Sequence, residues 1–275
     1  MAGTQWNAID QQHHSFEEHY CAFLDILGYK EHSEQFFANR LNLYGRFKRA
    51  LAHARAVNAQ SQTFVKNDLL KVRFFSDSIV LSHPVHEQVK DAAYNILQMC
   101  KNLSTFLSFE GLFLRGGISK GRHYEQQDQE LNASFLCSEA LQEAYDLESK
   151  HAVYPRILIH EKVVDNLSGM CRSLVAKDLN YHFLHFLPRF VKLQGDNLGA
   201  VKNELEDIYA IWKSCTSLRV QEKYRWLLSY YYWTITFIPE IDLRSFEKYN
   251  IGDTINFRLL DFSTSRLLDF STSEL

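Results

Sequence analysis

Short hydrophobic runs bounded by turn-forming residues organise the first two thirds of the chain. Residues 18–27, 69–75 and 79–82 form three such runs, and the tripeptide 76–78, Ser-Asp-Ser, separates the last two. Runs of this length that are rich in β-branched and aromatic residues are typical of strands, and the second and third predict a hairpin. Further strands are predicted at residues 112–119, 154–160 and 181–187, with a polar loop at residues 126–130.

Helical spacing of large apolar residues fills the segments between these runs. It predicts one long helix at residues 31–58. The same spacing predicts helices at residues 85–107, 135–149 and 161–167. The resulting order is β-α-β-β-α-β followed by further helices and strands, which is the ferredoxin-like order. We therefore predict an α+β fold, with an antiparallel sheet that carries helices on one face and brings Asp25 and Asp77 to the same edge.

The chain changes character from about residue 197 onward. Residues 201–238 predict a long helical stretch that is rich in aromatic residues. The octapeptide at residues 258–265 is repeated without change at residues 266–273. Solenoid repeats are longer and need several copies, so we expect the second copy to be a frayed tail. The predicted organisation is a flexible arm at residues 1–17, a main domain at residues 18–190 and a helical extension at residues 191–275.

The composition narrows the class of protein. Hydrophobic residues make up 46% of the 275 residues, which is enough for a full core. A formal net charge of −3 argues against nucleic acid as a partner. The five cysteines are odd in number and form no CxxC pair, which favours reduced thiols. We find no apolar signal core and no run near the ~20 residues that span a bilayer, so we expect a cytoplasmic protein without a membrane partner.

Asp25 lies near the end of the first hydrophobic run. An acid in such a position is costly to bury unless a cation compensates it. Gly28 lets the backbone turn and approach a ligand, and the free N–H groups at the start of the next helix favour a polyphosphate. The main-chain carbonyl of Ile26 is available as another oxygen ligand. The alternative is that Asp25 caps the helix that follows.

Asp77 lies at the tip of the predicted hairpin. Taken alone, its tripeptide is ordinary turn chemistry. Paired with Asp25 on a neighbouring strand end, it forms a set of oxygen ligands. Such a set favours Mg²⁺ or Mn²⁺ over zinc or copper.

Four motifs together give the chain a family likeness. They are Phe23-Leu-Asp-Ile-Leu-Gly28, Phe75-Ser-Asp-Ser78, Leu114-Arg-Gly-Gly-Ile-Ser-Lys-Gly121, and Ala140-Leu-Gln-Glu-Ala-Tyr-Asp-Leu-Glu148 followed by Tyr154-Pro-Arg-Ile-Leu-Ile159. Over residues 18–165 the chain resembles the class III nucleotidyl cyclases, in particular the bacterial pyrimidine cyclases of the Pycsar anti-phage defence systems. The resemblance implies a palm-type catalytic domain that acts as a head-to-tail homodimer with shared active sites.

The resemblance also implies a reaction and a set of residues. A nucleoside triphosphate would be cyclised to its 3′,5′-cyclic monophosphate with release of pyrophosphate. Two divalent metal ions, Mn²⁺ or Mg²⁺, would be held by Asp25, Asp77 and the carbonyl of Ile26. The residues implied to contact the nucleotide are Phe23, Leu27, Gly28, Tyr29, Arg73 and Gln142.

The base-reading position departs from the purine cyclases of the family. These often carry Lys or Glu four residues before the second metal aspartate, where this chain has Arg73. Arginine has only donors, so it suits the carbonyl oxygens of uracil or cytosine. We therefore expect UTP or CTP as the substrate, with UTP preferred. The product, cUMP or cCMP, would be a second messenger in anti-phage defence that a separate effector senses.

A second departure concerns the transition state. Where the family carries an asparagine and an arginine on a later helix, this chain has Gln142 and Asp146. Aspartate cannot supply a positive charge, so another cation is needed. The candidates are Arg115, Lys120, Arg122 and Arg156, of which we favour Arg122 because it follows the Gly-Gly strand near the expected cleft.

Two alternatives stay open. The first is an adenylate or guanylate cyclase, against which Arg73 argues. The second is a catalytically inert cyclase-fold module that only binds nucleotides, which the aspartate at position 146 favours.

Overall fold

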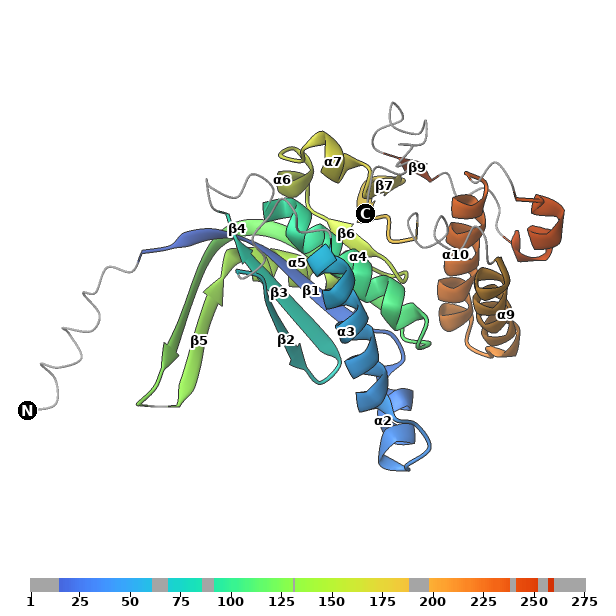
Figure 1. Ribbon diagram of the computed structural model, residues 1–275, viewed down its shortest axis with the longest axis horizontal. Coiled ribbons are helices and arrows are strands. Elements are labelled where there is room, and N and C mark those ends of the chain that lie inside the picture. The colour runs from blue at the N-terminus through green and yellow to red at the C-terminus, as the bar shows by residue number, and fades with distance from the viewer. Residues whose placement is uncertain are drawn as a thin grey trace, which may run out of the picture.

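A computed structural model describes residues 15–60, 69–85, 92–130, 132–187, 198–237, 241–251 and 257–259 (Figure 1). The strands are β1 (Glu17–Ile26), β2 (Lys71–Phe75), β3 (Ser78–Pro84), β4 (Leu114–Asp128), β5 (Ala133–Ser138), β6 (Ile157–Ile159), β7 (Val175–Asp178), β8 (Tyr181–Leu184) and β9 (Arg258–Leu259). The helices are α2 (Tyr29–Phe37), α3 (Leu43–Gln60), α4 (Ala92–Ser108), α5 (Glu139–His151), α6 (Glu161–Val164), α7 (Gly169–Arg172), α9 (Leu198–Ser214), α10 (Leu218–Ile235) and the 3-10 helix η2 (Leu243–Tyr249).

The described strands form one mixed sheet in the order β2-β3-β1-β4-β6-β8-β7-β9, and β5 pairs with the far part of β4. The pairing is antiparallel except between β4 and β6. The α+β class is therefore confirmed. The spatial order β2-β3-β1-β4 is what a β-α-β-β-α-β chain gives in a ferredoxin-like sheet.

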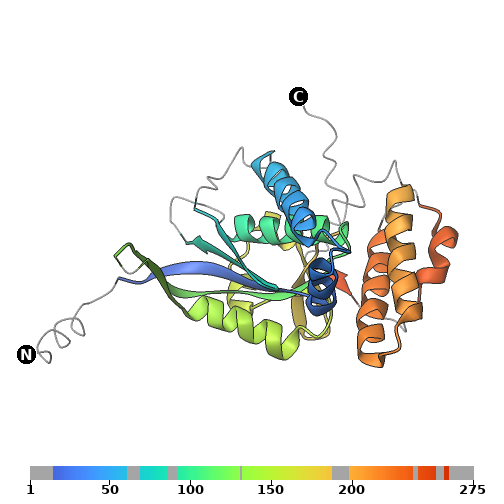
Figure 2. The ribbon, with the colours of Figure 1, turned by 90° about the horizontal axis from the view of Figure 1, so that it is seen from below.

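Helices cover both faces of the sheet (Figure 2). On one face, Leu24, Ile79 and Ile96 belong to a buried core shared by β1, β3, α3 and α4. On the other face lies α5, against β1 and β4. The prediction of helices on one face holds for α3 and α4 and is wrong for α5. Gly117 explains the close approach of α5, since a Cβ there would overlap the carbonyl of Ala144.

The single helix predicted at residues 31–58 is wrong. The structure has α2 and α3 instead, and Asn39 between them adopts a left-handed backbone conformation with φ of 56°. A right-handed helix cannot pass through that conformation. The side chain of Asn42 accepts a hydrogen bond from the Gly45 N–H at 2.8 Å, which starts the second helix.

The helix predicted from residue 135 begins later. Residues 135–138 belong to β5, and the Ser138 side chain caps α5 by accepting from the Leu141 N–H at 3.1 Å. The polar segment at residues 126–130 is largely part of the long β4–β5 hairpin, because main-chain pairing continues to Asp128. The predictions also lack β7 and α7, and the stretch at residues 201–238 contains two helices rather than one.

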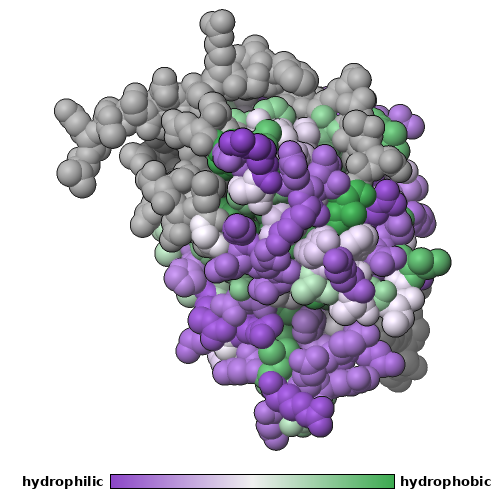
Figure 3. Space-filling view, turned by 90° about the vertical axis from the view of Figure 1, so that its right-hand side faces the viewer, coloured by the Kyte–Doolittle hydropathy of each residue, from purple (hydrophilic) through white to green (hydrophobic). Residues whose placement is uncertain are grey.

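The C-terminal helices share a core with the sheet. Phe113, which directly precedes β4, and Phe183 of β8 are buried with Val201 of α9 and with Trp226 and Tyr230 of α10. The solvent-facing side of this region is mostly hydrophilic, with separate apolar patches (Figure 3). The apolar faces of α9 and α10 are thus used against the sheet end.

Two predicted segments fall largely outside the described residues. Residues 1–14 of the predicted arm and the whole second copy of the octapeptide are not described, whereas Glu17 already belongs to β1. Arg258 and Leu259, from the first copy, pair as β9 with β7. Across the described part of the chain, no helix is both long and apolar enough to cross a membrane.

Candidate functional site

Asp25 lies near the end of β1, and Asp77 lies beside it in the turn between β2 and β3. Asp25 faces Ser78 in the β1–β3 register, and the Ile26 N–H donates to the carbonyl of Asp77 at 3.0 Å. Both acids are partly exposed. In a regular strand the N–H and C=O of one residue point to the same neighbour, so the Ile26 carbonyl also belongs to the side of Asp77. The three groups expected to be metal ligands are therefore adjacent.

Arg115 faces Asp25 from the other neighbouring strand. Its Nε donates a hydrogen bond to Asp25 Oδ2 at 2.8 Å. The same Nε lies 2.8 Å from Glu148 Oε1 on α5. The arginine nearest the two aspartates is thus Arg115 rather than the predicted Arg122. The structure also adds Glu148, to which the sequence assigned no role although it ends one of the four motifs.

Glu148 is almost completely buried, with 4% of its side chain exposed. Burial raises the pKa of its carboxyl group, Arg115 opposes this shift, and the charges of Asp25 and Asp77 add to it. The electrostatic coupling places Glu148 in the same charge cluster as the two aspartates. We call these three acids and Arg115 the acid end of β1.

Helix α10 reaches the acid end from the C-terminal region. The ring of Tyr224 packs edge-on against Phe113 with centroids 6.0 Å apart, and the Phe113 carbonyl accepts from the Leu27 N–H at 2.9 Å. The neighbouring Lys223 has a lowered pKa because of its burial and the charge of Arg115, which Asp25 and Glu148 partly offset. A cation from α10 therefore lies within electrostatic range of the acids, and no sequence motif indicated it.

The turn after β1 has the geometry of a ligand-binding loop. Gly28 has φ of 71° and is the N-cap of α2. Asp25 therefore does not occupy the N-cap position, and its carboxylate accepts a hydrogen bond from Arg115 instead. The first N–H groups of α2 have no acceptor within the helix, so they remain available to an anion.

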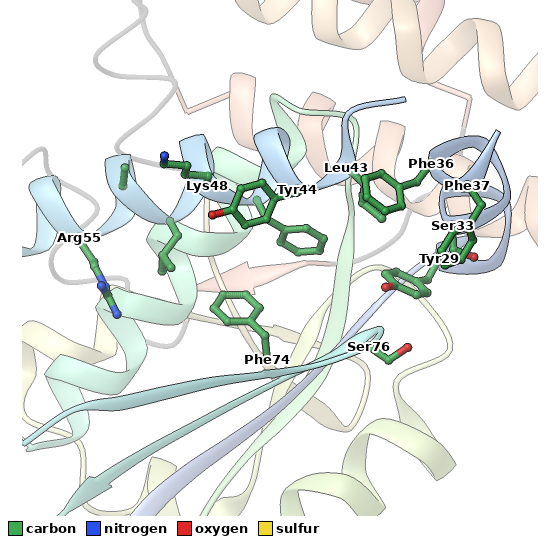
Figure 4. A pocket seen from close by; sticks show the side chains of 13 residues that line it. Tyr29, Ser33, Phe36, Phe37, Leu43, Tyr44, Lys48, Arg55, Phe74 and Ser76 are labelled. Carbon is green, nitrogen blue, oxygen red and sulfur yellow. The ribbon is translucent and has the colours of Figure 1, made fainter. Parts of the chain in front are cut away.

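A cavity of about 600 Å³ borders this turn (Figure 4). Tyr29, which follows Gly28, and Ser76, which precedes Asp77, both line it. The rest of the wall is mainly aromatic and comes from α2, α3 and β2; it includes Phe36, Phe37, Tyr44, Phe47 and Phe74, with Lys48 and Arg55 as the cations.

Arg73 is held away from the acid end. It faces Val80 in the β2–β3 register, and its guanidinium pairs with Glu125. Lys71 Nζ also contacts Glu125, at 3.0 Å. Phe23, the neighbour of Val80 on β1, packs edge-on against Tyr145 of α5 at 5.2 Å. The structure therefore gives Arg73 a carboxylate partner rather than an open base-reading position.

The remaining predicted cations are also engaged elsewhere. Arg122 has 67% of its side chain exposed, and its Nε donates to Glu139 at 2.9 Å. It faces Glu18 on β1, seven residues from Asp25, which corresponds to roughly 23 Å along the strand. Arg122 therefore lies far from Asp25 along the sheet, and its predicted catalytic role stays a prediction. Lys120 pairs with Glu18 at 2.8 Å, and Arg156 pairs with buried Asp178.

Gln142 and Asp146 lie exposed on α5. Asp146 pairs with Lys150 at 2.9 Å, one helical turn away. Neither residue lies in the acid end of its own chain.

The donor set suits a hard cation. No group of three or more His, Cys, Asp or Glu side chains in the described ranges is arranged to hold a metal ion. A metal at Asp25 and Asp77 would therefore complete its shell with the Ile26 carbonyl and with ligand or water oxygens. Mg²⁺ commonly binds in this way, through one or two carboxylates and substrate phosphates. The residues present fit such an ion.

Comparisons with known proteins give only distant likenesses. No protein-family model and no curated protein matches the chain. Among solved structures, it is similar to the adenylyl cyclase CyaB from P. aeruginosa, with 15% identity, a TM-score of 0.44, and coverage of 62% of this chain and 95% of that one. A bacterial light-regulated adenylyl cyclase gives 13% identity, a TM-score of 0.44, and coverage of 63% and 52%.

A guanylyl cyclase domain of the RhoGC fusion protein from Blastocladiella emersonii gives 13% identity, a TM-score of 0.41, and coverage of 61% and 96%. With identities this low and TM-scores below 0.5, these likenesses do not establish a family or an activity.

Proposed function

We propose that this protein is a metal-dependent nucleotidyl cyclase that converts a nucleoside triphosphate to its 3′,5′-cyclic monophosphate and pyrophosphate. The observation that carries the proposal is the adjacency of Asp25 and Asp77, whose strands are joined by the Ile26–Asp77 hydrogen bond at 3.0 Å. Just after β1, Gly28 in a left-handed conformation opens α2, which is a place for a triphosphate. The four family motifs of the sequence meet at this point.

Each part of the site has a task in this reaction. Asp25, Asp77 and the Ile26 carbonyl would hold the divalent ions. When bound, such ions lower the pKa of the attacking hydroxyl group and neutralise charge on the phosphates. Gly28 lets the backbone approach the phosphates, and the N–H groups of the first turn of α2 donate to their oxygens. These groups fix the triphosphate beside the two acids.

The substrate we propose is a pyrimidine nucleotide, UTP or CTP, on the strength of the family resemblance and of Arg73. Because Arg73 pairs with Glu125, reading a base requires it to leave or share that carboxylate. We also propose a homodimer, in which the exposed Gln142 on α5 is free to contact a nucleotide bound by a second copy. The cyclic product would then serve as a messenger in anti-phage defence through a separate effector.

Two observations favour the alternative of a nucleotide-binding module without catalysis. Arg115 already occupies one oxygen of Asp25, and α5 offers aspartate where the family has arginine. Such a module would bind triphosphates and release no pyrophosphate.

The test is incubation of the protein with ATP, GTP, UTP and CTP, each with Mn²⁺, followed by detection of cyclic nucleotide and pyrophosphate. We expect cUMP or cCMP. Asp77→Ala should lower turnover by at least about 1,000-fold, since the site loses one of its two metal carboxylates. Asp165→Ala is the matched control, because Asp165 is exposed at the end of α6. A purine product contradicts the pyrimidine assignment, and the absence of product from all four nucleotides contradicts the cyclase.

A further inference from the structure

Asp25 and Glu148 compete for one proton donor. Arg115 Nε is 2.8 Å from Asp25 Oδ2 and 2.8 Å from Glu148 Oε1. The Nε atom of arginine carries a single proton, which can point directly at only one of the two carboxylates. In the structure it donates to Asp25.

Glu148 Oε1 is consequently left as a buried oxygen without a hydrogen-bond partner in the described part of the chain. A buried carboxylate oxygen with no donor is costly, and native structures rarely keep one without a reason. Arg115 Nε, equally near to both acids, is the donor that would satisfy it.

The fold holds Glu148 in this position. Gly117 lies two residues beyond Arg115 on the same face of β4, and a Cβ at Gly117 would come within 2.7 Å of Leu147 Cβ. The bare backbone at Gly117 thus lets the last turn of α5 lie directly on the strand. Glu148 follows Leu147 and is brought beside Arg115.

We propose that Glu148 is a positioning residue that takes over Arg115 when a divalent cation binds Asp25. Without the cation, Arg115 neutralises Asp25. A bound cation takes the charge of Asp25, and a guanidinium that stayed on the same carboxylate would repel it. Transfer of the Nε hydrogen bond to Glu148 keeps Arg115 paired and removes it as a competitor. The exchange moves no proton and breaks no covalent bond.

This inference rests on the metal assignment in the proposed function, and its test measures binding rather than turnover. Mn²⁺ affinity is measured by electron paramagnetic resonance of the free ion, with no nucleotide present. Glu148→Gln keeps the shape but offers Arg115 a weaker, neutral acceptor. We expect it to weaken Mn²⁺ binding about tenfold, as is common for residues that orient a metal ligand. The control is Glu143→Gln on the same helix, which pairs with Lys162 and Ser119 and should leave the affinity unchanged.

A double-mutant cycle separates the exchange from a general effect of lost negative charge. In an Arg115→Gln background no guanidinium competes for Asp25, so Glu148→Gln should have no further effect on Mn²⁺ affinity. If the tenfold loss persists in that background, or if Glu148→Gln alone has no effect, the exchange is wrong. Should Arg115→Gln fail to fold, Arg115→Met gives the same cycle, because methionine keeps an unbranched side chain without the positive charge, and Glu148→Gln should again have no further effect on Mn²⁺ affinity.

The failures are distinguishable. If the wild type binds Mn²⁺ but forms no cyclic nucleotide, the proposed function fails and the cycle still decides the exchange. If the wild type is active and the cycle shows no coupling between positions 115 and 148, only the exchange is overturned. If the wild type binds no Mn²⁺ at all, both the metal assignment and the exchange are wrong.

Discussion

The two ends of β1 carry charge clusters of opposite balance on the same face of the sheet. At the acid end, Asp25 and Glu148 share the single guanidinium of Arg115. At the other end, Lys71 and Arg73 share the single carboxylate of Glu125. We call this second cluster, with the stacked imidazoles of His19 and His123, the basic end. The acid end thus has an excess of carboxylates, and the basic end has an excess of cations.

The difference decides which end suits a metal. The basic end contains histidines and a carboxylate, which are metal-ligand types, yet two cations lie on that carboxylate. Burial raises the pKa of Glu125, but the hydrogen bonds from Lys71 and Arg73 outweigh it and the pKa is lowered overall. The negative charge of Glu125 is therefore already neutralised by Lys71 and Arg73. At the acid end, Glu148 Oε1 has no hydrogen-bond partner among the described residues, so an added cation improves the charge balance of the cluster there. The types of residue alone would not have shown which of the two ends is better suited to a metal ion.

The largest effect on stability is expected from adding a methyl group under α5 at each end. Gly117→Ala at the acid end drives a Cβ into the backbone of Ala144, whereas Gly121→Ala places one 3.1 Å from the Ala140 nitrogen. We expect Gly117→Ala to lower the free energy of unfolding by about 3 kcal/mol and Gly121→Ala by roughly 1 kcal/mol. Urea unfolding of both variants measures this. Equal losses would show that α5 does not sit more tightly at the acid end.

The next effect tests whether the basic end is structural. Glu125→Gln removes the charge that Lys71 and Arg73 share, and one nitrogen of Arg73 is already buried without a partner in the described residues. The expected cost is about 1–2 kcal/mol of unfolding free energy, because the pairs are partly screened by solvent. Mn²⁺ affinity should not change. A loss of Mn²⁺ binding comparable to that expected for Glu148→Gln would erase the distinction between the ends.

The smallest effect concerns pH. Burial, and then the charge of neighbouring His123, lower the pKa of His19 to about 4 from 6.5. Between pH 6.5 and pH 4, the unfolded chain therefore binds more protons at this histidine than the folded chain does. The contribution of His19 to the free energy of unfolding is thus fully present above pH 6.5 and falls as the pH drops towards 4. His19→Phe keeps a ring against His123 and removes this titration. When the pH is lowered from 6.5 to 4, we expect the free energy of unfolding of the variant to fall by about 2 kcal/mol less than that of the wild type. Thermal or urea unfolding measures this difference. Parallel pH curves would show that His19 is not buried as described.

The periodicity of the sequence found most of the sheet but misplaced several helix boundaries. The predicted strand at residues 18–27 and the hairpin around Asp77 are present as β1, β2 and β3. Short apolar segments bounded by turn residues are typical of strands, so the sequence pattern was sufficient here. The break between α2 and α3 escaped detection, since apolar residues continue at helical spacing through it while Asn39 turns left-handed. The first residues of the helix predicted at 135–149 form β5, since a short apolar run has no decisive period.

The sequence by itself determined which residues could carry chemistry and, through the strand order, that Asp25 and Asp77 share a sheet edge. Those facts depend on local pattern and on chain order. Only the tertiary structure decided the partners of the charges. Arg115 lies on Asp25 because β4 pairs with β1 in that register, and Glu148 lies beside it because Gly117 lets α5 approach. Arg73, which the sequence assigned to a base, is paired with Glu125. A long charged side chain takes the partner that folding brings within reach, and its neighbours in sequence do not specify that partner.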